Sequence, residues 1–227
     1  MYIIGKINPL TEKDVLTIEK EINFKLPQEY KMFLSKYGYG NIHDYLYFDA
    51  PDENFIKNNF DGNMNIWEWT DDINADFVFD AILISRTKNG DIVLCCRNYD
   101  NRYILLPRHS AHPVQFVSFE SLLKYLLKHL GRKKYFDSTY DRKIENISLI
   151  KNSTIDRKLI YKIRKLLLKK YTFDKVYNRK TQPVYVFQSI GGFIYFNLIH
   201  KNSINVKYQS MYETEAQEII KFIKEKI

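Results

Sequence analysis

The sequence predicts an α+β protein: an antiparallel or mixed sheet flanked by helices, followed by a smaller α-β-β-β-α module. Three observations support this fold class. Residues 82–97 hold two apolar segments around Asn89-Gly90, a pair that tolerates the positive φ of a tight hairpin turn. Apolar residues recur at helical spacing before and after the strand candidates. The net charge also changes sign near residue 131.

Composition and charge predict two modules. The 227 residues are 45% hydrophobic and 27% charged, enough to bury a core. Residues 1–131 hold 14 Lys and Arg against 18 Asp and Glu, a net charge of −4, whereas residues 132–227 hold 21 against 9, a net charge of +12. We therefore expect a first domain at 1–131, a polar linker at 132–152 and a basic module at 153–227.

The compartment is predicted from what the chain lacks. It has no cationic start followed by a long apolar core, and no apolar run near the roughly 18 residues of a membrane span. The two cysteines, Cys95 and Cys96, are adjacent, so on a strand their side chains point to opposite faces and cannot easily pair. A cytoplasmic protein with reduced thiols and no membrane partner is expected.

Two helices are expected before the first strand. Thr11 can cap the first helix and Asp14 suits its positive end, while Pro27 can start the second and Gly38 can end it. Each helix has an apolar face at helical spacing: Val15, Ile18 and Ile22 in the first, and Tyr30, Phe33, Leu34 and Tyr37 in the second. The aromatic stripe of the second helix indicates core packing, with a binding groove as the alternative.

The segments after these helices alternate between strand and helix patterns. Residues 44–49 alternate like a strand, and strands are expected at 82–84, 92–94, 103–106 and 114–117. A helix capped by Ser118 follows, with a leucine face, and Gly131 ends it. The four strands from residue 82 therefore form a meander that closes onto this helix.

Residues 44–80 form an acidic region with ten acidic side chains against Lys57 alone, a net charge of −9. One interpretation is a solvated acidic loop with its two tryptophans in the core. The other is a partner surface, where acids steer the encounter and a tryptophan anchors it; we expect one tryptophan buried and one exposed. The candidate partner-binding residues are Asp44, Asp49, Asp52, Glu53, Asp61, Trp67, Glu68, Trp69, Asp71, Asp72 and Asp76.

Three stretches between about residues 10 and 130 resemble the SUKH superfamily of fungal cell-wall-synthesis regulators and bacterial immunity proteins. They read IEKEINFKLPQEYKMFLSKYGYGNI, AILISRTKNGDIVLCCR and VSFESLLKYLL. The positions that match the family pattern are Leu26, Pro27, Tyr30, Phe33, Gly38, Gly90, Asp91, Ser118, Phe119 and Glu120. The resemblance implies no catalytic residues, and it implies binding and neutralisation of a toxin encoded nearby.

The basic module begins with a predicted helix. Ser153 to Asp156 resembles a capping box, and an apolar face follows at Ile155, Leu159, Ile163, Leu166 and Leu167. A basic stripe runs along the same helix at Lys158, Lys162, Lys165 and Lys169. It is interpreted as a solvated face or, alternatively, as a contact to phosphates or to an acidic protein.

The module continues with three strands and a last helix. The strands are expected at 184–188, 193–199 and 204–208, with a hairpin turn at Gly191-Gly192. Thr214 and Gln217 resemble a capping pair for the final helix. Its apolar face consists of Ala216, Ile219, Ile220, Ile223 and Ile227.

Motifs for catalysis are missing. His109 and His112 lie three residues apart without a cysteine pair or an acid between them, which does not indicate a metal site. No glycine-rich phosphate loop and no flanked serine nucleophile occurs. We therefore expect no enzyme, no cofactor and no metal.

Three functions remain as hypotheses. The first is an immunity-type protein that occludes a bacterial polymorphic toxin; if that toxin is a nuclease, its basic cleft would attract the acidic region. The second is a nucleic-acid-associated protein that acts through the basic C-terminal module. The third is a regulatory scaffold similar to the fungal members, with several cellular partners.

Overall fold

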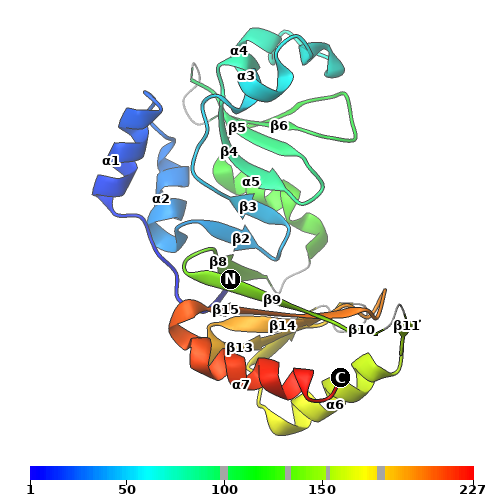
Figure 1. The fold of residues 1–227 in the computed structure, drawn as a ribbon. Helices are drawn as coiled ribbons and strands as arrows, with labels where there is room; N and C mark the ends of the chain where they lie inside the picture. Colours follow the sequence, from blue (N-terminus) through cyan, green and yellow to red (C-terminus); the bar gives the residue numbers. More distant parts are fainter. Residues whose placement is uncertain (98–101, 131–133, 152–153, 178–181) are drawn as a thin grey trace. The chain divides into compact units, whose positions relative to one another are not determined.

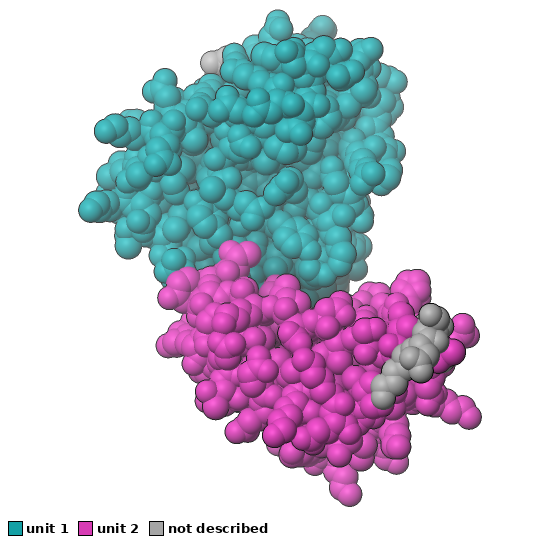
Figure 2. All heavy atoms as spheres, in the orientation of Figure 1, with its two compact units in different colours: residues 1–2, 7–138 teal, residues 3–6, 139–227 magenta. Residues whose placement is uncertain are grey.

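The computed structural model describes residues 1–97, 102–130, 134–151, 154–177 and 182–227. These residues divide into two compact units, coloured separately in Figure 2. Unit 1 comprises residues 1–2 and 7–138, and unit 2 comprises residues 3–6 and 139–227. The fold is α+β, as predicted, and Figure 1 shows its elements in chain order. That the two units fold independently stays a prediction.

Unit 1 is built on a large sheet with the strand order β1-β8-β2-β3-β4-β5-β6-β7. Neighbouring strands from β8 to β7 are antiparallel, so β4 to β7 form the predicted meander. Of β1, only Tyr2 belongs to this unit. The strands are β1 (Tyr2–Ile4), β2 (Gly40–Ile42), β3 (Leu46–Phe48), β4 (Ile82–Thr87), β5 (Ile92–Cys95), β6 (Tyr103–Leu106), β7 (Val114–Phe116) and β8 (Tyr135–Ser138).

Three helices, α1 (Glu12–Glu21), α2 (Gln28–Tyr37) and α5 (Phe119–Leu126), supply apolar side chains to a core shared with one face of this sheet. The predicted caps are confirmed. Thr11 and Asp14 form a capping box, and the Ser118 side chain accepts from the Ser121 N–H. Gly38 ends α2 with φ of 71°, and a Cβ there would lie 2.0 Å from the Asn8 carbonyl oxygen, so only glycine fits.

The opposite face of the sheet is covered by the connection between β3 and β4, which carries α3 (Phe55–Phe60), the 3₁₀ turn η1 (Met64–Ile66) and α4 (Ala75–Phe79). The two cysteines confirm this two-sided burial. Cys95 belongs to the core beneath the helices and Cys96 to the core beneath the connection, and both are free thiols. Burial raises the pKa of Cys96 to about 11, so its thiol is inert at neutral pH.

Unit 2 is built on an antiparallel sheet with the order β12-β13-β14-β15-β9. The helices α6 (Leu159–Lys170) and α7 (Glu213–Lys224) share a single apolar core with this sheet. The predicted three strands and final apolar face are confirmed as β13 to β15 and α7. The strands are β9 (Arg142–Ser148), β12 (Lys175–Tyr177), β13 (Val184–Phe187), β14 (Gly192–Phe196) and β15 (Ser203–Gln209), with the two-stranded pair β10 (Ile150–Lys151) and β11 (Thr154–Ile155).

Short 3₁₀ turns complete the chain: η2 (Lys128–Leu130), η3 (Gln188–Ile190) and η4 (Ser210–Tyr212). The side chain of Gln209, fully buried, holds the N-terminal segment 3–6 within unit 2. Its Oε1 accepts from the Lys6 N–H and its Nε2 donates to the Lys6 carbonyl, each at 2.8 Å. Gln188 binds the same segment with two hydrogen bonds: its Oε1 accepts from the Gly5 N–H and its Nε2 donates to the Ile3 carbonyl. Unit 2 thus contains residues from both ends of the chain.

The structure corrects the interpretation of residues 132–152 as a linker. Part of this segment forms β8 in unit 1, and part forms β9, which pairs with β15 along seven residues in unit 2. The pattern was missed because β9 has only one buried side chain, Ile147, so it shows no apolar alternation. Residues 131–133 and 152–153, including Gly131 and Ser153, lie outside the described residues.

Two predicted helix starts in unit 2 are also wrong. Ile155 lies in β11, and α6 begins at Leu159 without a side-chain cap. Thr214 lies inside α7, because η4 leads directly into a helix that begins at Glu213. Among the residues described, no helix is both long and apolar enough to span a membrane.

Candidate partner-binding site

The acidic region falls mostly on the connection between β3 and β4, here called the α3–α4 segment (residues 49–81). It has only two short helices, of six and five residues. Its apolar side chains Ile56, Trp67, Ile73 and Val78 pack onto Leu83, Ile92, Leu94, Ile104 and Leu106 of the sheet. A long irregular connection fixed to a rigid sheet is a common location for binding surfaces.

The two tryptophans of this segment are packed together. Trp67 is 6% exposed and donates its indole N–H to the Pro107 carbonyl at 3.2 Å. Trp69 is half-buried and donates to the Met64 carbonyl at 3.0 Å, with the two ring systems 6.0 Å apart. Trp67 is therefore a core residue. The expectation that the other tryptophan is exposed is wrong, since Trp69 packs against the same core.

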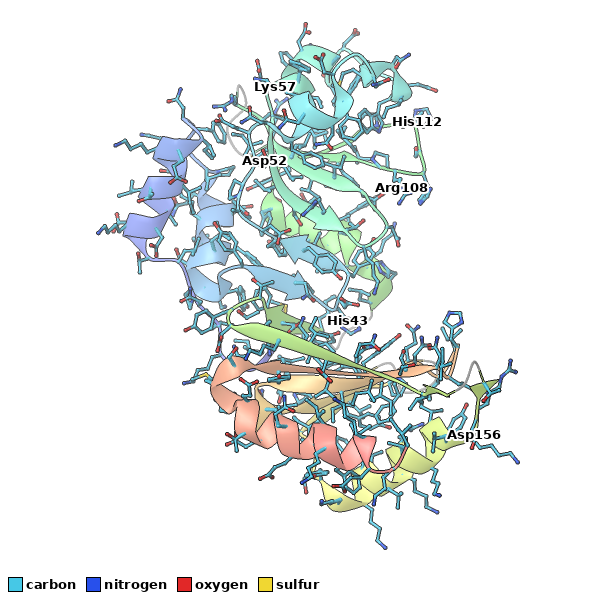
Figure 3. All side chains as sticks on the ribbon, in the orientation of Figure 1. His43, Asp52, Lys57, Arg108, His112 and Asp156 are labelled. Carbon is cyan, nitrogen blue, oxygen red and sulfur yellow. The ribbon has the colours of Figure 1, made fainter. Side chains whose placement is uncertain are left out.

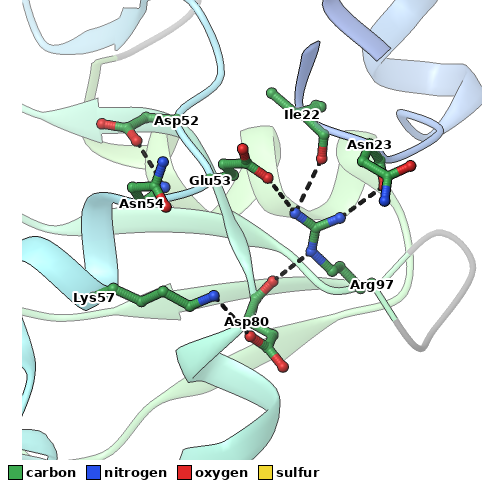
Figure 4. A network of polar contacts seen from close by, with 8 residues as sticks. All are labelled: Ile22, Asn23, Asp52, Glu53, Asn54, Lys57, Asp80 and Arg97. Carbon is green, nitrogen blue, oxygen red and sulfur yellow. Dashed lines mark hydrogen bonds and ion pairs between the residues drawn. The ribbon is translucent and has the colours of Figure 1, made fainter. Parts of the chain in front are cut away.

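Arg97 ties the start of the α3–α4 segment to its end and to the end of α1 (Figure 4). Its guanidinium donates to the carbonyls of Ile22, Asn23 and Asp80, at 3.0, 2.9 and 3.1 Å. It also forms a 2.7 Å ion pair with Glu53. Because a planar guanidinium can donate in several directions at once, one side chain satisfies carbonyls that a helix end leaves free. Glu53 is thus a structural ion-pair partner.

Several other acids of the region 44–80 are paired within unit 1. The ion pairs are Asp44 with Lys88 at 2.6 Å, Asp49 with Arg86 at 3.0 Å, and Asp80 with Lys57 at 3.1 Å. Glu68 Oε2 lies 3.3 Å from Nδ1 of His112, and Asp52 accepts from the Asn54 N–H at 2.9 Å. These pairs are exposed and reduce the acidic character of the surface around them.

As far as the structure describes the chain, four aspartate side chains of this segment have neither a partner cation nor a hydrogen bond, whereas Asp52 keeps its hydrogen bond from the Asn54 N–H. In the part of the chain that the structure describes, Asp61, Asp71, Asp72 and Asp76 make no ion pair, and all four are exposed. We call these four residues the acidic patch. Of the eleven residues predicted to bind a partner, these four acids are unpaired, five acids have partners within unit 1, and both tryptophans are packed against the sheet core.

A pocket of about 380 Å³ is lined in part by the α3–α4 segment. Phe60, Ile66 and Trp67 form its apolar wall, and Arg108 and His109 line it from the connection between β6 and β7. Figure 3 labels Arg108 and His112 on this connection. Ile66 is 50% exposed, although an isoleucine usually lies inside a fold. The same segment therefore carries an accessible apolar side chain, part of a cavity wall and the unpaired acids.

The sequence offered little indication of these pocket residues. Ile66 follows no helical or alternating pattern, because it ends a single 3₁₀ turn. Arg108 and His109 lie about forty residues after Trp67 in the chain, yet all three line the same pocket. The Pro107 carbonyl that accepts from Trp67 belongs to the same connection.

The alternative site, the basic stripe of unit 2, is also exposed. Lys158, Lys162, Lys165 and Lys169 are all exposed, and Lys158 is the residue just before α6. No metal-binding group of His, Cys, Asp and Glu occurs among the residues described.

A family model described as SMI1-KNR4 cell-wall (SUKH_6) matches residues 12–126. The chain belongs to the SUKH superfamily, whose members are generally non-catalytic immunity or regulatory proteins. Searches of curated proteins and of solved structures found no match.

Proposed function

We propose that this protein is an immunity-type binding protein that neutralises a bacterial polymorphic toxin by occluding it directly. Membership of the SUKH superfamily supports an immunity or regulator role in general. The choice of surface is supported by one observation: a single segment, residues 60–76, carries four unpaired aspartates together with the exposed Ile66 and the pocket beside it.

Charge and apolar area would act together at this surface. A toxin that acts on nucleic acid has a basic cleft, because it must hold phosphates, and that cleft attracts an acidic surface. Exposed charges act mainly on the association rate, whereas an apolar side chain buried at the centre of an interface acts on the dissociation rate. The acidic patch would therefore steer the toxin, and Ile66 would anchor it.

The test uses the full-length protein and the C-terminal toxin domain encoded beside its gene. Reversing Asp71 and Asp72 to Lys should slow association. The difference in association rate from the wild type should shrink as the salt concentration rises, because the Debye length falls to about 3 Å at 1 M. Ile66→Ala should instead speed dissociation, because a central anchor is typically worth about 2 kcal/mol. Binding kinetics at several salt concentrations separate the two effects.

The matched control reverses Glu215 and Glu218, two exposed acids on α7 that make no ion pair within the described residues. This control changes the net charge equally and should leave the association rate within about twofold of the wild type. Full-strength binding by the Asp71 and Asp72 reversal would exclude the acidic patch as the contact. Capture of several cellular proteins and no toxin would favour a regulatory scaffold.

A further inference from the structure

The strongest unassigned surface lies on α6 of unit 2. We call Lys158, Lys162, Lys165 and Lys169 the basic face of α6. At about 100° per residue these positions fall within roughly 60° of each other around the helix axis. Eleven residues separate the first from the last, so the four side chains extend over about 16 Å of helix. The basic face is therefore a narrow, straight row of positive charge.

This row is not neutralised by its surroundings. Among the described residues, none of the four lysines makes an ion pair. Residues 157–170 hold seven Lys and Arg and no acid. Asp156, labelled in Figure 3 at the start of α6, accepts from the Lys158 backbone N–H at 2.8 Å. The neighbouring helix α7 carries exposed acids at Glu215, Glu218 and Glu225, but none of them reaches the row.

Further cations widen the row on both sides. Lys201 places its ammonium 5.5 Å from the ring centre of Tyr161, which is 43% exposed. Lys170 and Lys226 both lie over the Phe222 ring, at 4.5 and 5.3 Å from its centre. Ammonium groups that rest on aromatic faces are held in place without losing their charge. The basic surface thus continues from α6 onto the end of α7.

The type of partner follows from what the face lacks. A membrane-surface helix must bury its apolar side in lipid, but Ile160, Ile163 and Leu167 are fully buried in the core of unit 2. A protein interface usually has an apolar or aromatic centre and few lysines, whereas this row consists of lysines alone. A regular row of ammonium groups instead suits a polymer with a repeating negative charge.

We propose that the basic face of α6 binds the phosphodiester backbone of a nucleic acid, independently of sequence. Lys158, Lys162, Lys165 and Lys169 contact successive phosphates. The exposed part of the Tyr161 ring, beside the Lys201 ammonium, offers a surface on which an unpaired base can stack. DNA and RNA share the phosphate chemistry that this face recognises.

The test measures the fluorescence anisotropy of labelled 20-mers of random sequence titrated with the full-length protein. The four probes are duplex DNA, duplex RNA, single-stranded DNA and single-stranded RNA. With four phosphates contacted, the logarithm of the affinity should fall against the logarithm of salt with a slope of about −3.6 for duplex DNA and about −2.8 for a single strand. Comparing the four probes shows which nucleic acid is preferred.

Replacing Lys162, Lys165 and Lys169 by Gln should weaken binding at least about tenfold at 50 mM salt and bring the slope close to −1. Replacing the same three residues by Arg should restore binding, since the charge returns. The matched control replaces Lys13, Lys20 and Lys25, three exposed lysines of unit 1, by Gln and should bind as the wild type does.

Three results would overturn the proposal. These are no binding of any probe at 50 mM salt, equal losses in the Gln variant and the control, or equally tight binding of polyglutamate of the same length. The last result would assign the face to an acidic protein. Because all substituted lysines are exposed, the variants should keep the wild-type unfolding midpoint, and that measurement accompanies each titration.

Discussion

The acidic patch and the basic face of α6 carry charges of opposite sign on two different kinds of scaffold. The acids lie on a connection with two short helices, held to its sheet by Trp67 and by the hydrogen bonds of Arg97. The lysines lie on a twelve-residue helix whose opposite side is buried in the core of unit 2. The helix fixes the spacing of its charges by backbone geometry, whereas the connection depends on a few long-range contacts.

The largest test of this difference removes the contact that fixes the α3–α4 segment. Trp67→Ala should lower the free energy of unfolding by about 3–5 kcal/mol, because it empties a buried indole site and leaves the Pro107 carbonyl without its donor. Urea unfolding measured by circular dichroism reports the change.

Ile66→Ala is the neighbouring control for this prediction. Ile66 is 50% exposed, so its truncation should cost about 1 kcal/mol or less. Equal losses in the two variants would mean that Trp67 does not anchor the segment. The pair also separates stability from binding, because the toxin contact proposed above depends on Ile66.

The second test removes the polar part of the same attachment. Arg97→Met should cost about 2 kcal/mol, because it leaves three carbonyls and Glu53 without a donor while keeping most of the side-chain volume. The Arg97 side chain is 26% exposed, so water replaces part of what is lost. The change is measured from the shift in the urea midpoint.

Arg86→Met provides the control, because Arg86 forms a single exposed ion pair with Asp49. Exposed pairs contribute little, so this variant should change the free energy of unfolding by less than about 0.5 kcal/mol. If Arg97→Met were as mild as Arg86→Met, the bonds in Figure 4 would contribute no more than a surface pair.

The sequence predicted the regular parts well and the irregular parts poorly, for physical reasons. The capping box of Thr11, the turn at Gly90 and the opposite orientation of Cys95 and Cys96 depend on neighbouring residues, so a local pattern reveals them. The row of lysines was recognised because helical spacing is periodic. By contrast, β9 is too exposed to alternate, and it was interpreted as a linker.

The division of the acids into paired and unpaired groups could not be predicted at all. The cations that neutralise Asp44, Asp49 and Glu53 come from Lys88, Arg86 and Arg97, which are about forty residues later in the chain. Sheet pairing between β3 and β4 brings the first two pairs together. A charge count over residues 44–80 therefore overestimates the acidic surface, and only the folded chain reveals the four aspartates that remain.

The smallest test compares the two charged surfaces directly. Lys165 and Lys169 on α6 are four residues apart, as are Lys162 and Lys158 just before the helix. At this spacing like charges destabilise a helix by about 0.2–0.5 kcal/mol per pair. Lys162→Gln together with Lys165→Gln should therefore raise the free energy of unfolding by a few tenths of a kcal/mol, and high salt should remove the gain.

Asp71→Asn with Asp72→Asn should give a smaller gain, because an irregular segment allows the two side chains to turn away from each other. Urea midpoints at 20 mM and 500 mM NaCl provide the comparison. A larger gain from the aspartates would show that the α3–α4 segment holds its charges as rigidly as the helix does.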